Sequence, residues 1–216
     1  MQISFKFYIL VINQLSHKKR YHEKTFGMLL AFSGIIIYSC NNNQTAVSEP
    51  GTNLSKDSLT KRGEYLVNAI GCGDCHSPKK MSPQGPVPDP DLMLSGHPSS
   101  MPLPVIDTAA AKNWLLFTQD LTVFVGPWGT SYAANITSDE TGIGKWTEAQ
   151  FFTAIRQGKS KGMVGGRNLL PPMPWQNFAT LNDTDLKSIF YFLQSTKPIS
   201  NVVPSPAPPL GMLGMK

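Results

Sequence analysis

Five consecutive residues constrain this chain more than any other stretch: Cys72, Gly73, Asp74, Cys75 and His76, a C-x-x-C-H pattern. Two thiols three positions apart on one helical turn can each form a thioether to a vinyl group of a haem. The histidine that follows then lies on the proximal side, where its imidazole can bind the iron. The pattern therefore predicts one covalent c-type haem, with both cysteines as attachment residues and His76 as an iron ligand.

Two other kinds of site share the C-x-x-C part of this pattern. A thioredoxin-like redox pair would need a βαβ pattern around it, and a zinc site would need a second Cys or His pair at ligand spacing. Neither context is present in the sequence, where the third cysteine, Cys40, stands alone. The sequence therefore favours haem attachment over a zinc site or a dithiol redox pair.

The first residues have the order of an export signal. A basic stretch precedes an apolar run, 26–38, which is shorter than the ~20 residues of a membrane-spanning helix. A small residue then precedes Cys40, which resembles the lipidation site of bacterial lipoproteins. We expect 1–39 to be a lipoprotein-type signal, Cys40 to be lipidated and 40–56 to be a polar tether. An uncleaved anchor is the alternative, and both interpretations place the rest of the chain on the periplasmic side of a bacterial membrane.

The positive charge of the chain is concentrated in that signal. The net charge is +5 over the whole chain, but 1–39 hold five basic and one acidic side chain. The remaining 14 basic and 13 acidic side chains give a net charge of only +1. A mature chain is thus nearly neutral, so nucleic-acid binding has no electrostatic support. One cysteine for lipid and two for haem leave none for a disulfide.

Three segments have the apolar spacing of amphipathic helices. The first, about 58–72, ends in the attachment motif. The second, about 147–157, opens with a T-E-A-Q capping box and ends at Gly158. The third, about 183–195, follows the N-cap candidate Asn182 and has acidic residues in its first turn. These segments are the expected core helices.

A glycine interrupts the apolar stripe of the first helix, which Asp57 or Ser58 would cap. Glycine in a helix lowers helix stability by about 1 kcal/mol relative to alanine, so the presence of Gly63 needs a structural reason. Close approach of another helix would supply one, and a merely tolerated glycine is the alternative. We expect the third helix to cross the first at Gly63.

The long connection between the first two helices is rich in turn-forming residues. Residues 77–104 contain many Pro, Ser and Met and are expected to be irregular. Residues 108–118 could form a short helix, and 121–125 with 131–136 a small two-stranded element. Connections of this length usually carry function or pack on a cofactor, and a haem offers a large apolar face to cover.

The second axial ligand is expected to be Met173. A thioether opposite the histidine favours the reduced iron. Three prolines surround this methionine in L-P-P-M-P-W and fix the backbone φ, so a stiff loop can hold the sulfur against the iron. His97 is the alternative and would give a bis-imidazole haem of lower potential, while core filling is the structural role open to Met173. Other methionines considered are Met81, Met93, Met101, Met163, Met212 and Met215.

Together these motifs resemble a known family. The G-E-Y-L-V stretch at 63–67, the attachment motif and Met173 before a terminal helix resemble a class I cytochrome c domain over about 57–200. The segment 135–147 is similar to the cytochrome subunits that serve membrane-bound alcohol, aldehyde and sugar dehydrogenases. The resemblance implies a mainly α fold with three core helices and long loops around the haem, axial ligands His76 and Met173, and electron transfer. Those subunits carry several such domains, whereas this chain has one attachment motif.

The sequence thus predicts an exported, membrane-anchored monohaem cytochrome with a cytochrome domain at 57–200 and a Pro- and Gly-rich tail at 201–216. We expect outer-sphere transfer of one electron between Fe(III) and Fe(II), without substrate at the iron and so without enzyme activity of its own. Expected partners are redox proteins, such as a membrane-bound dehydrogenase or a terminal oxidase. The alternatives are a haem enzyme or gas sensor with an open sixth position, and a thiol redox protein without haem.

Overall fold

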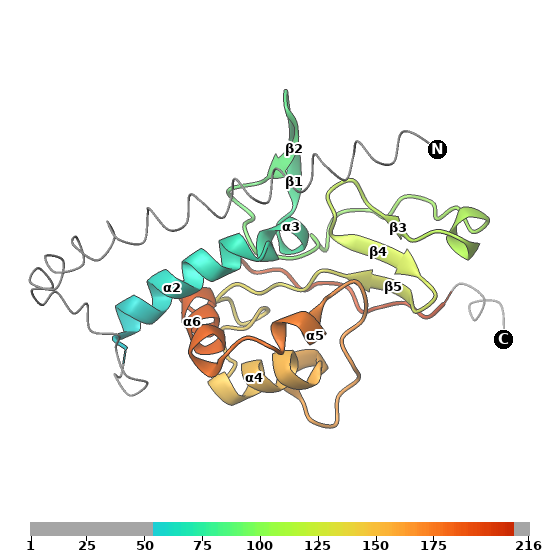
Figure 1. Cartoon of the computed structure of the whole chain (residues 1–216). Coiled ribbons are helices and arrows are strands. Elements are labelled where there is room, and N and C mark those ends of the chain that lie inside the picture. Colours follow the sequence, from blue (N-terminus) through green and yellow to red (C-terminus); the bar gives the residue numbers. More distant parts are fainter. Residues whose placement is uncertain (1–53, 210–216) are drawn as a thin grey trace, which may run out of the picture. The chain divides into compact units, whose positions relative to one another are not determined.

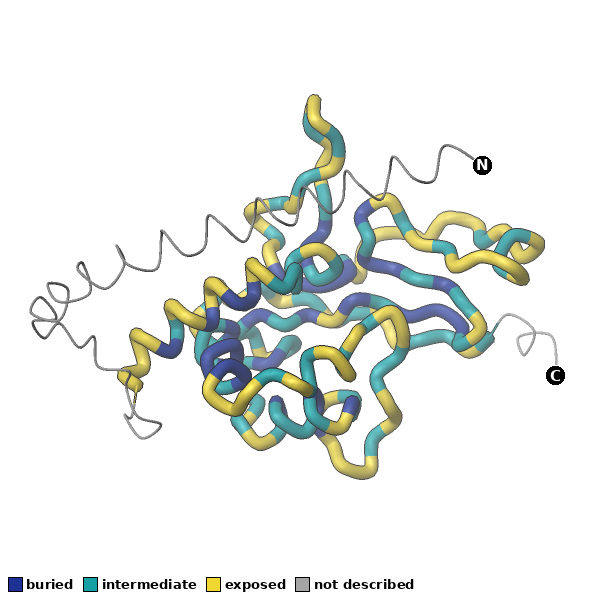
Figure 2. Tube along the Cα trace, in the orientation of Figure 1, coloured by how far each residue is buried: buried dark blue, intermediate teal, exposed yellow. Residues whose placement is uncertain are grey.

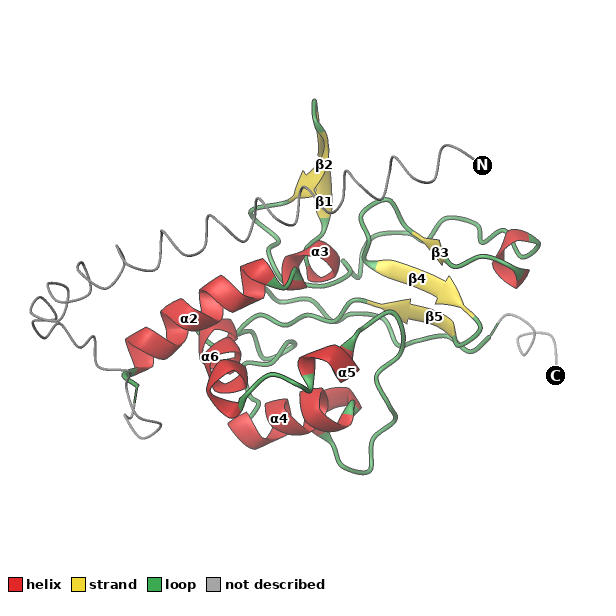
Figure 3. Ribbon diagram, in the orientation of Figure 1, coloured by secondary structure: helices red, strands yellow, loops and turns green. Residues whose placement is uncertain are grey.

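The computed structural model describes residues 54–209, and the predicted signal and lipidation site lie outside this range. The helices gather on one side of the view in Figure 1 and a three-stranded sheet on the other, as Figure 3 also shows. The helices are α2 (Lys56–Ala69), α3 (Cys72–His76), α4 (Glu148–Gln157), α5 (Trp175–Phe178) and α6 (Asp183–Leu193). Within 54–209, no helix has both the length and the apolarity needed to cross a bilayer.

The strands form two small antiparallel sheets. In the first, β1 (Lys79–Ser82) pairs with β2 (Gly85–Pro88) as a hairpin. In the second, β4 (Val123–Gly126) pairs on one side with β3 (Leu116–Phe117) and on the other with β5 (Gly129–Tyr132). The Cα register of the second hairpin runs from Val123 opposite Tyr132 to Gly126 opposite Gly129.

Helices α2 and α6 cross in backbone contact. Gly63 is buried at the crossing, and a Cβ added to it would overlap the carbonyl oxygen of Ser188 and lie 2.7 Å from the Cβ of Phe192. A residue without a side chain is therefore required at this position. The structure confirms the predicted crossing at Gly63 and gives the physical reason for the glycine.

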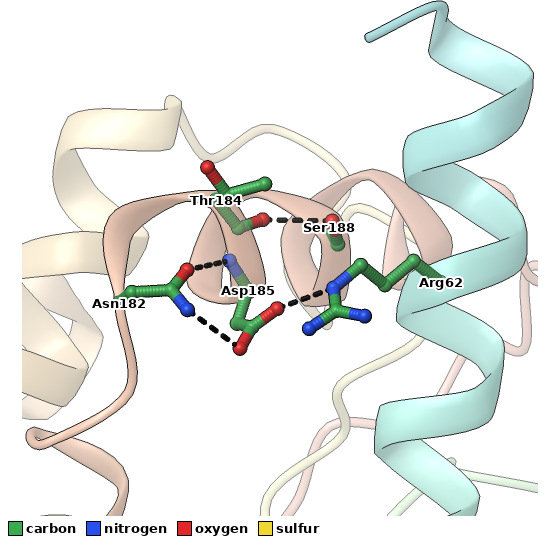
Figure 4. A network of polar contacts seen from close by, with 5 residues as sticks. All are labelled: Arg62, Asn182, Thr184, Asp185 and Ser188. Carbon is green, nitrogen blue, oxygen red and sulfur yellow. Dashed lines mark hydrogen bonds and ion pairs between the residues drawn. The ribbon is translucent and has the colours of Figure 1, made fainter. Parts of the chain in front are cut away.

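A polar network lies beside this crossing (Figure 4). Arg62 Nε donates to Asp185 Oδ1, and Asn182 Nδ2 donates to Asp185 Oδ2 at 2.9 Å. Asn182 is also the N-cap of α6, since its Oδ1 accepts from the backbone N–H of Asp185 at 2.8 Å. Because Asp185 is buried, a lone carboxylate would be costly there, and the arginine and the asparagine compensate it. The predicted cap thus also orients the carboxylate that joins the two helices.

Helices α2, α4 and α6 supply most of the apolar core, and Figure 2 shows α6 as the most deeply buried of them. The predicted capping box of α4 is present, with Thr147 and Gln150 exchanging hydrogen bonds, and Gly158 ends the helix at φ 62°. Arg156 near the end of α4 pairs with Asp183 at 2.6 Å and so joins α4 to the start of α6. The buried cluster comprises Leu66, Val67, Leu94, Ile143, Phe151, Ile155, Leu186, Ile189, Phe190 and Leu193.

The first helix differs from its prediction at both ends. Its N-cap is Ser55, whose side chain accepts from the N–H of Ser58 at 3.2 Å, and not Asp57 or Ser58. The helix ends at Ala69, because Gly71 takes a left-handed conformation at φ 73° and turns the chain. The attachment motif therefore forms a separate short helix, α3.

The connection 77–136 is more ordered than expected. The stretch predicted to be irregular contains the β1–β2 hairpin, and the predicted helix 108–118 is reduced to a 3-10 turn at Ala110–Lys112 followed by β3. The predicted two-stranded element is present as β4 and β5. Ala207 extends this sheet by exchanging two backbone hydrogen bonds of 3.0 Å with Thr130, so part of the tail lies along β5.

A buried polar network joins His97 to the start of β4. His97 is 1% exposed, and its Nδ1 donates to Thr122 Oγ1 at 2.8 Å. That hydroxyl donates to Asp120 Oδ2 at 2.6 Å, and the His97 ring lies 5.3 Å from the ring of Tyr132. Burial lowers the pKa of His97, although Asp120 and the backbone of Met101 oppose this. The imidazole is therefore neutral in the folded chain at pH 7.

We expect Gly63→Ala to lower the free energy of unfolding by about 2–3 kcal/mol, because the added methyl group forces α2 away from α6. The gain of about 1 kcal/mol in helix propensity offsets only part of this loss. Urea denaturation of the purified variant measures the change. Gly165→Ala is the control, because no atom lies within 4 Å of a Cβ at that position. Equal unfolding midpoints for the two variants would contradict the contact.

We expect His97→Asn to reduce the pH dependence of stability. Because the folded pKa of His97 lies below the unfolded value of 6.5, the unfolded chain binds a proton first as pH falls. Stability is therefore lost as pH decreases through about 6.5 towards the folded pKa. Urea unfolding at pH 7 and pH 5 should show a smaller loss in the variant than in the wild type, and equal losses would remove His97 as the cause.

Candidate haem-attachment site

Helix α3 brings both thiols of the motif onto one turn. It holds Cys72, Cys75 and His76 within five residues, and both cysteines are half-buried and unpaired. Burial raises the pKa of Cys72 to about 11 and also raises the pKa of Cys75. A redox dithiol needs a stabilised thiolate, and this environment disfavours one. The site therefore suits thiols that are consumed in covalent bonds rather than thiols that exchange disulfides.

His76 is held in the form that a metal requires. Its Nδ1 lies 2.7 Å from the backbone oxygen of Ala134. A carbonyl can only accept, so Nδ1 carries the hydrogen and Nε2 keeps a free electron pair. Burial lowers the pKa of His76, and this effect exceeds the opposing one of the Ala134 carbonyl. The side chain is thus a neutral imidazole, in which Nδ1 is bonded to the Ala134 carbonyl and Nε2 is free to bind a metal.

The loop that presents Ala134 is itself fixed by hydrogen bonds. Asn135 Oδ1 accepts from the backbone and the hydroxyl of Thr137 at 3.0 and 2.8 Å, and its Nδ2 donates to the carbonyl of Ile199 at 2.8 Å. On the other side, the N–H of Gly96 donates to the carbonyl of His76 at 2.8 Å. Asn135 begins the segment that carried the family resemblance. Its side chain acts as scaffold and holds the carbonyl next to it.

Met173 lies in the turn that leads into α5. Its N–H donates to the carbonyl of Leu170 at 3.3 Å, and its own carbonyl accepts from the N–H of Trp175 at 2.9 Å. The side chain is half-buried and packs against the main apolar cluster, which Cys72 also contacts. The structure therefore brings the predicted sulfur ligand and the first attachment cysteine to the same cluster. Other side chains half-buried against it include Ile70, Ile136, Trp146 and Phe152.

The other candidate residues lie elsewhere. His97 belongs to the buried network with Thr122 and Asp120, and Cys40 lies outside the described residues. Two contributors were missed by the sequence analysis: the carbonyl of Ala134 and the ammonium of Lys79, which lies against α3. Every residue has a backbone oxygen, so the sequence does not show that the one of Ala134 has a role. Lys79 and Lys80 are both lysines, so the sequence does not show which of them contacts α3.

These donors fit a covalent haem. Two protonated thiols are displayed on one turn, a neutral imidazole keeps Nε2 free, and half-buried apolar side chains pack on the same core cluster as Cys72. The chemistry of this set matches thioether attachment, axial ligation by nitrogen and an apolar face for the porphyrin.

No family model matches the chain, but several known proteins are similar to it. A nicotinate dehydrogenase subunit of Pseudomonas putida is 29% identical over 160 residues, which cover 74% of this chain and 10% of that protein. The gluconate 2-dehydrogenase cytochrome c subunit of Pantoea cypripedii is 32% identical over 148 residues, or 68% of this chain and 25% of the relative. The cytochrome c subunit of the quinone alcohol dehydrogenase of Gluconobacter oxydans is 31% identical over 166 residues, with coverages of 74% and 27%.

The chain thus spans between 10% and 27% of the length of these relatives. These relatives confirm the resemblance inferred from the motifs, because two of the three are named as cytochrome c subunits. By its similarity to them, this chain is a relative of the cytochrome c subunits of dehydrogenases.

Proposed function

We propose that this chain is an exported, membrane-anchored monohaem c-type cytochrome that carries one electron at a time. The observation that carries the proposal is the geometry of α3, where two half-buried thiols and a neutral histidine with a free Nε2 share five residues. The similarity to cytochrome c subunits supports the same role and supports a class I cytochrome c-like arrangement of the three longer helices.

In this proposal His76 and Met173 would hold the haem iron. The Met173 loop is anchored by backbone hydrogen bonds on both sides of the sulfur-bearing residue, and its side chain shares an apolar cluster with Cys72. The environment of His97 argues against the alternative, because its Nδ1 is bonded to Thr122 and its ring is enclosed beside Tyr132. Moving His97 to an iron would disrupt a satisfied buried network.

A bound haem would supply an iron that cycles between Fe(III) and Fe(II). The residues of the chain would hold the haem and its ligands in place while the iron changes oxidation state. Thioethers to Cys72 and Cys75 would retain the group when ligand bonds weaken, and the Ala134 carbonyl prevents the imidazole of His76 from rotating. Met173 would hold the group together with His76, which would leave no free site for a substrate and would favour outer-sphere transfer of the electron.

The proposed partner is a dehydrogenase subunit or another redox protein on the periplasmic side of the membrane. Its support is the similarity to subunits of gluconate and alcohol dehydrogenases. The proposed anchor is lipid on Cys40, joined to the domain by the polar residues 41–56. Stable attachment requires more than one acyl chain, as lipoprotein-type modification provides.

We expect haem to remain with the polypeptide after acid-acetone extraction of the exported protein, because thioethers survive loss of the iron ligands. The double variant Cys72→Ser/Cys75→Ser should lose haem, which mass spectrometry of the intact chain measures. Cys40→Ser is the matched control: it should keep the haem and leave the membrane fraction. A wild-type chain without the added mass of haem would refute the proposed function, and a membrane-bound Cys40→Ser variant would refute the lipid anchor.

We expect Met173→Ala to lose the thioether-to-iron charge-transfer band in the optical spectrum and to gain carbon monoxide binding, because the sixth position opens. Met163→Ala is the control, since Met163 is 59% exposed and should leave the spectrum unchanged. An unchanged spectrum of Met173→Ala would remove this residue as a ligand and direct the search to His97. Rapid carbon monoxide binding by the wild type would instead favour the gas-sensor alternative.

A further inference from the structure

The end of the attachment helix is a weak point of the site. A helix of five residues forms too few internal hydrogen bonds to be stable alone, and its last carbonyls have no partner within the helix. Its N-terminal neighbour, Gly71, provides no side-chain cap. Contacts from outside the helix must therefore hold Cys75 and His76 in place.

The ammonium of Lys79 supplies such contacts. Its Nζ donates to the carbonyls of Asp74 and Ser77, the second at 2.7 Å, and reaches the carbonyl of Gly73 at 3.5 Å. All three oxygens lie at the C-terminal end of α3, where the helix dipole is negative and a cation is favoured. The ammonium of Lys79 thus binds carbonyls that the N–H groups of a further helical turn would otherwise bond.

The same ammonium also joins α3 to the sheet. Lys79 Nζ donates to the backbone oxygen of Asp120 at 3.1 Å, just before β4. The side chain of Asp120 is held in turn by Thr122. Lys79 is therefore fixed at a junction between the attachment helix and the buried network that contains His97.

The charge of Lys79 lies beside His76. The two carbonyls that its ammonium binds, those of Asp74 and Ser77, flank Cys75 and His76 in the chain, and the Lys79 side chain is half-buried. A half-buried charge is screened less by solvent and salt than an exposed one. Lys80 offers the contrast, because it is exposed and meets only Asp89, at 3.8 Å.

We propose that Lys79 is a positioning residue of the haem site: its ammonium caps the attachment helix through the carbonyls of Asp74 and Ser77, and its positive charge favours the reduced iron. The proposal rests on the haem function proposed above. A fixed positive charge near the iron opposes the additional positive charge of Fe(III), so Lys79 raises the midpoint potential.

The test compares three variants of the haem-loaded protein in a spectroelectrochemical titration. We expect Lys79→Met to lower the midpoint potential below that of wild type and of Lys80→Met, which removes the same charge one residue away. The difference should persist at high salt, because the Lys79 charge is partly shielded from ions. Lys79→Arg keeps the charge and should stay closer to wild type than Lys79→Met.

The outcomes separate this proposal from the proposed function. A wild type without haem refutes both, and haem-loaded Lys79→Met with the potential of Lys80→Met refutes only the role of Lys79. If Lys79→Met retains no haem, the comparison moves to Lys79→Arg and Lys79→Gln. A lower potential or lower haem content in Lys79→Gln than in Lys79→Arg supports the charged cap, and equal values refute it.

Discussion

The hydrogen bond between His76 Nδ1 and the carbonyl of Ala134 is the constraint around which the candidate site is organised. A free imidazole can exchange tautomers and rotate, and either change would remove the electron pair that a metal needs. A backbone carbonyl prevents both, provided that it is itself immobile. Hydrogen bonds within the connection between α3 and α4 keep the loop that carries this carbonyl in place.

Several segments fix the loops around this carbonyl. Asn135 fixes it from one side through the backbone of Ile199, and Asn201 donates to the carbonyls of Ser95 and His97 at 2.7 and 2.8 Å. The N–H of Gly96 donates in turn to the carbonyl of His76. The residues just after α6, Ile199 and Asn201, thus stabilise the loop opposite α3.

The sequence was informative where side-chain chemistry acts locally. The capping box of α4, the Asn182 cap of α6 and the glycine at the α2–α6 crossing were all predictable, because each depends on a residue type with a specific backbone role. The C-x-x-C-H motif supports a specific prediction for the same reason, although the haem itself stays a proposal. Its pattern combines three reactive groups whose spacing admits few alternatives.

Other features depend on tertiary surroundings and left no local signal. The break at Gly71 was missed because the apolar spacing of the first helix continues into the motif. The β1–β2 hairpin was missed because its strands are only four residues long and contain no buried residue, so no apolar pattern marks them in the sequence. Lys79 and Lys80 have identical chemistry, and only their surroundings show that one caps α3 and the other meets solvent.

The crossing of α2 with α6 has a kinetic consequence. Arg62 and Asp185, which meet beside it, are separated by 123 positions in the chain. Bringing such distant residues together costs loop-closure entropy before any contact repays it, which slows the rate-limiting step of folding. During synthesis the core cannot close until its last helix has emerged, so a shortened polypeptide that ends before Asp183 would expose the apolar stripe of α2 and would be prone to aggregate.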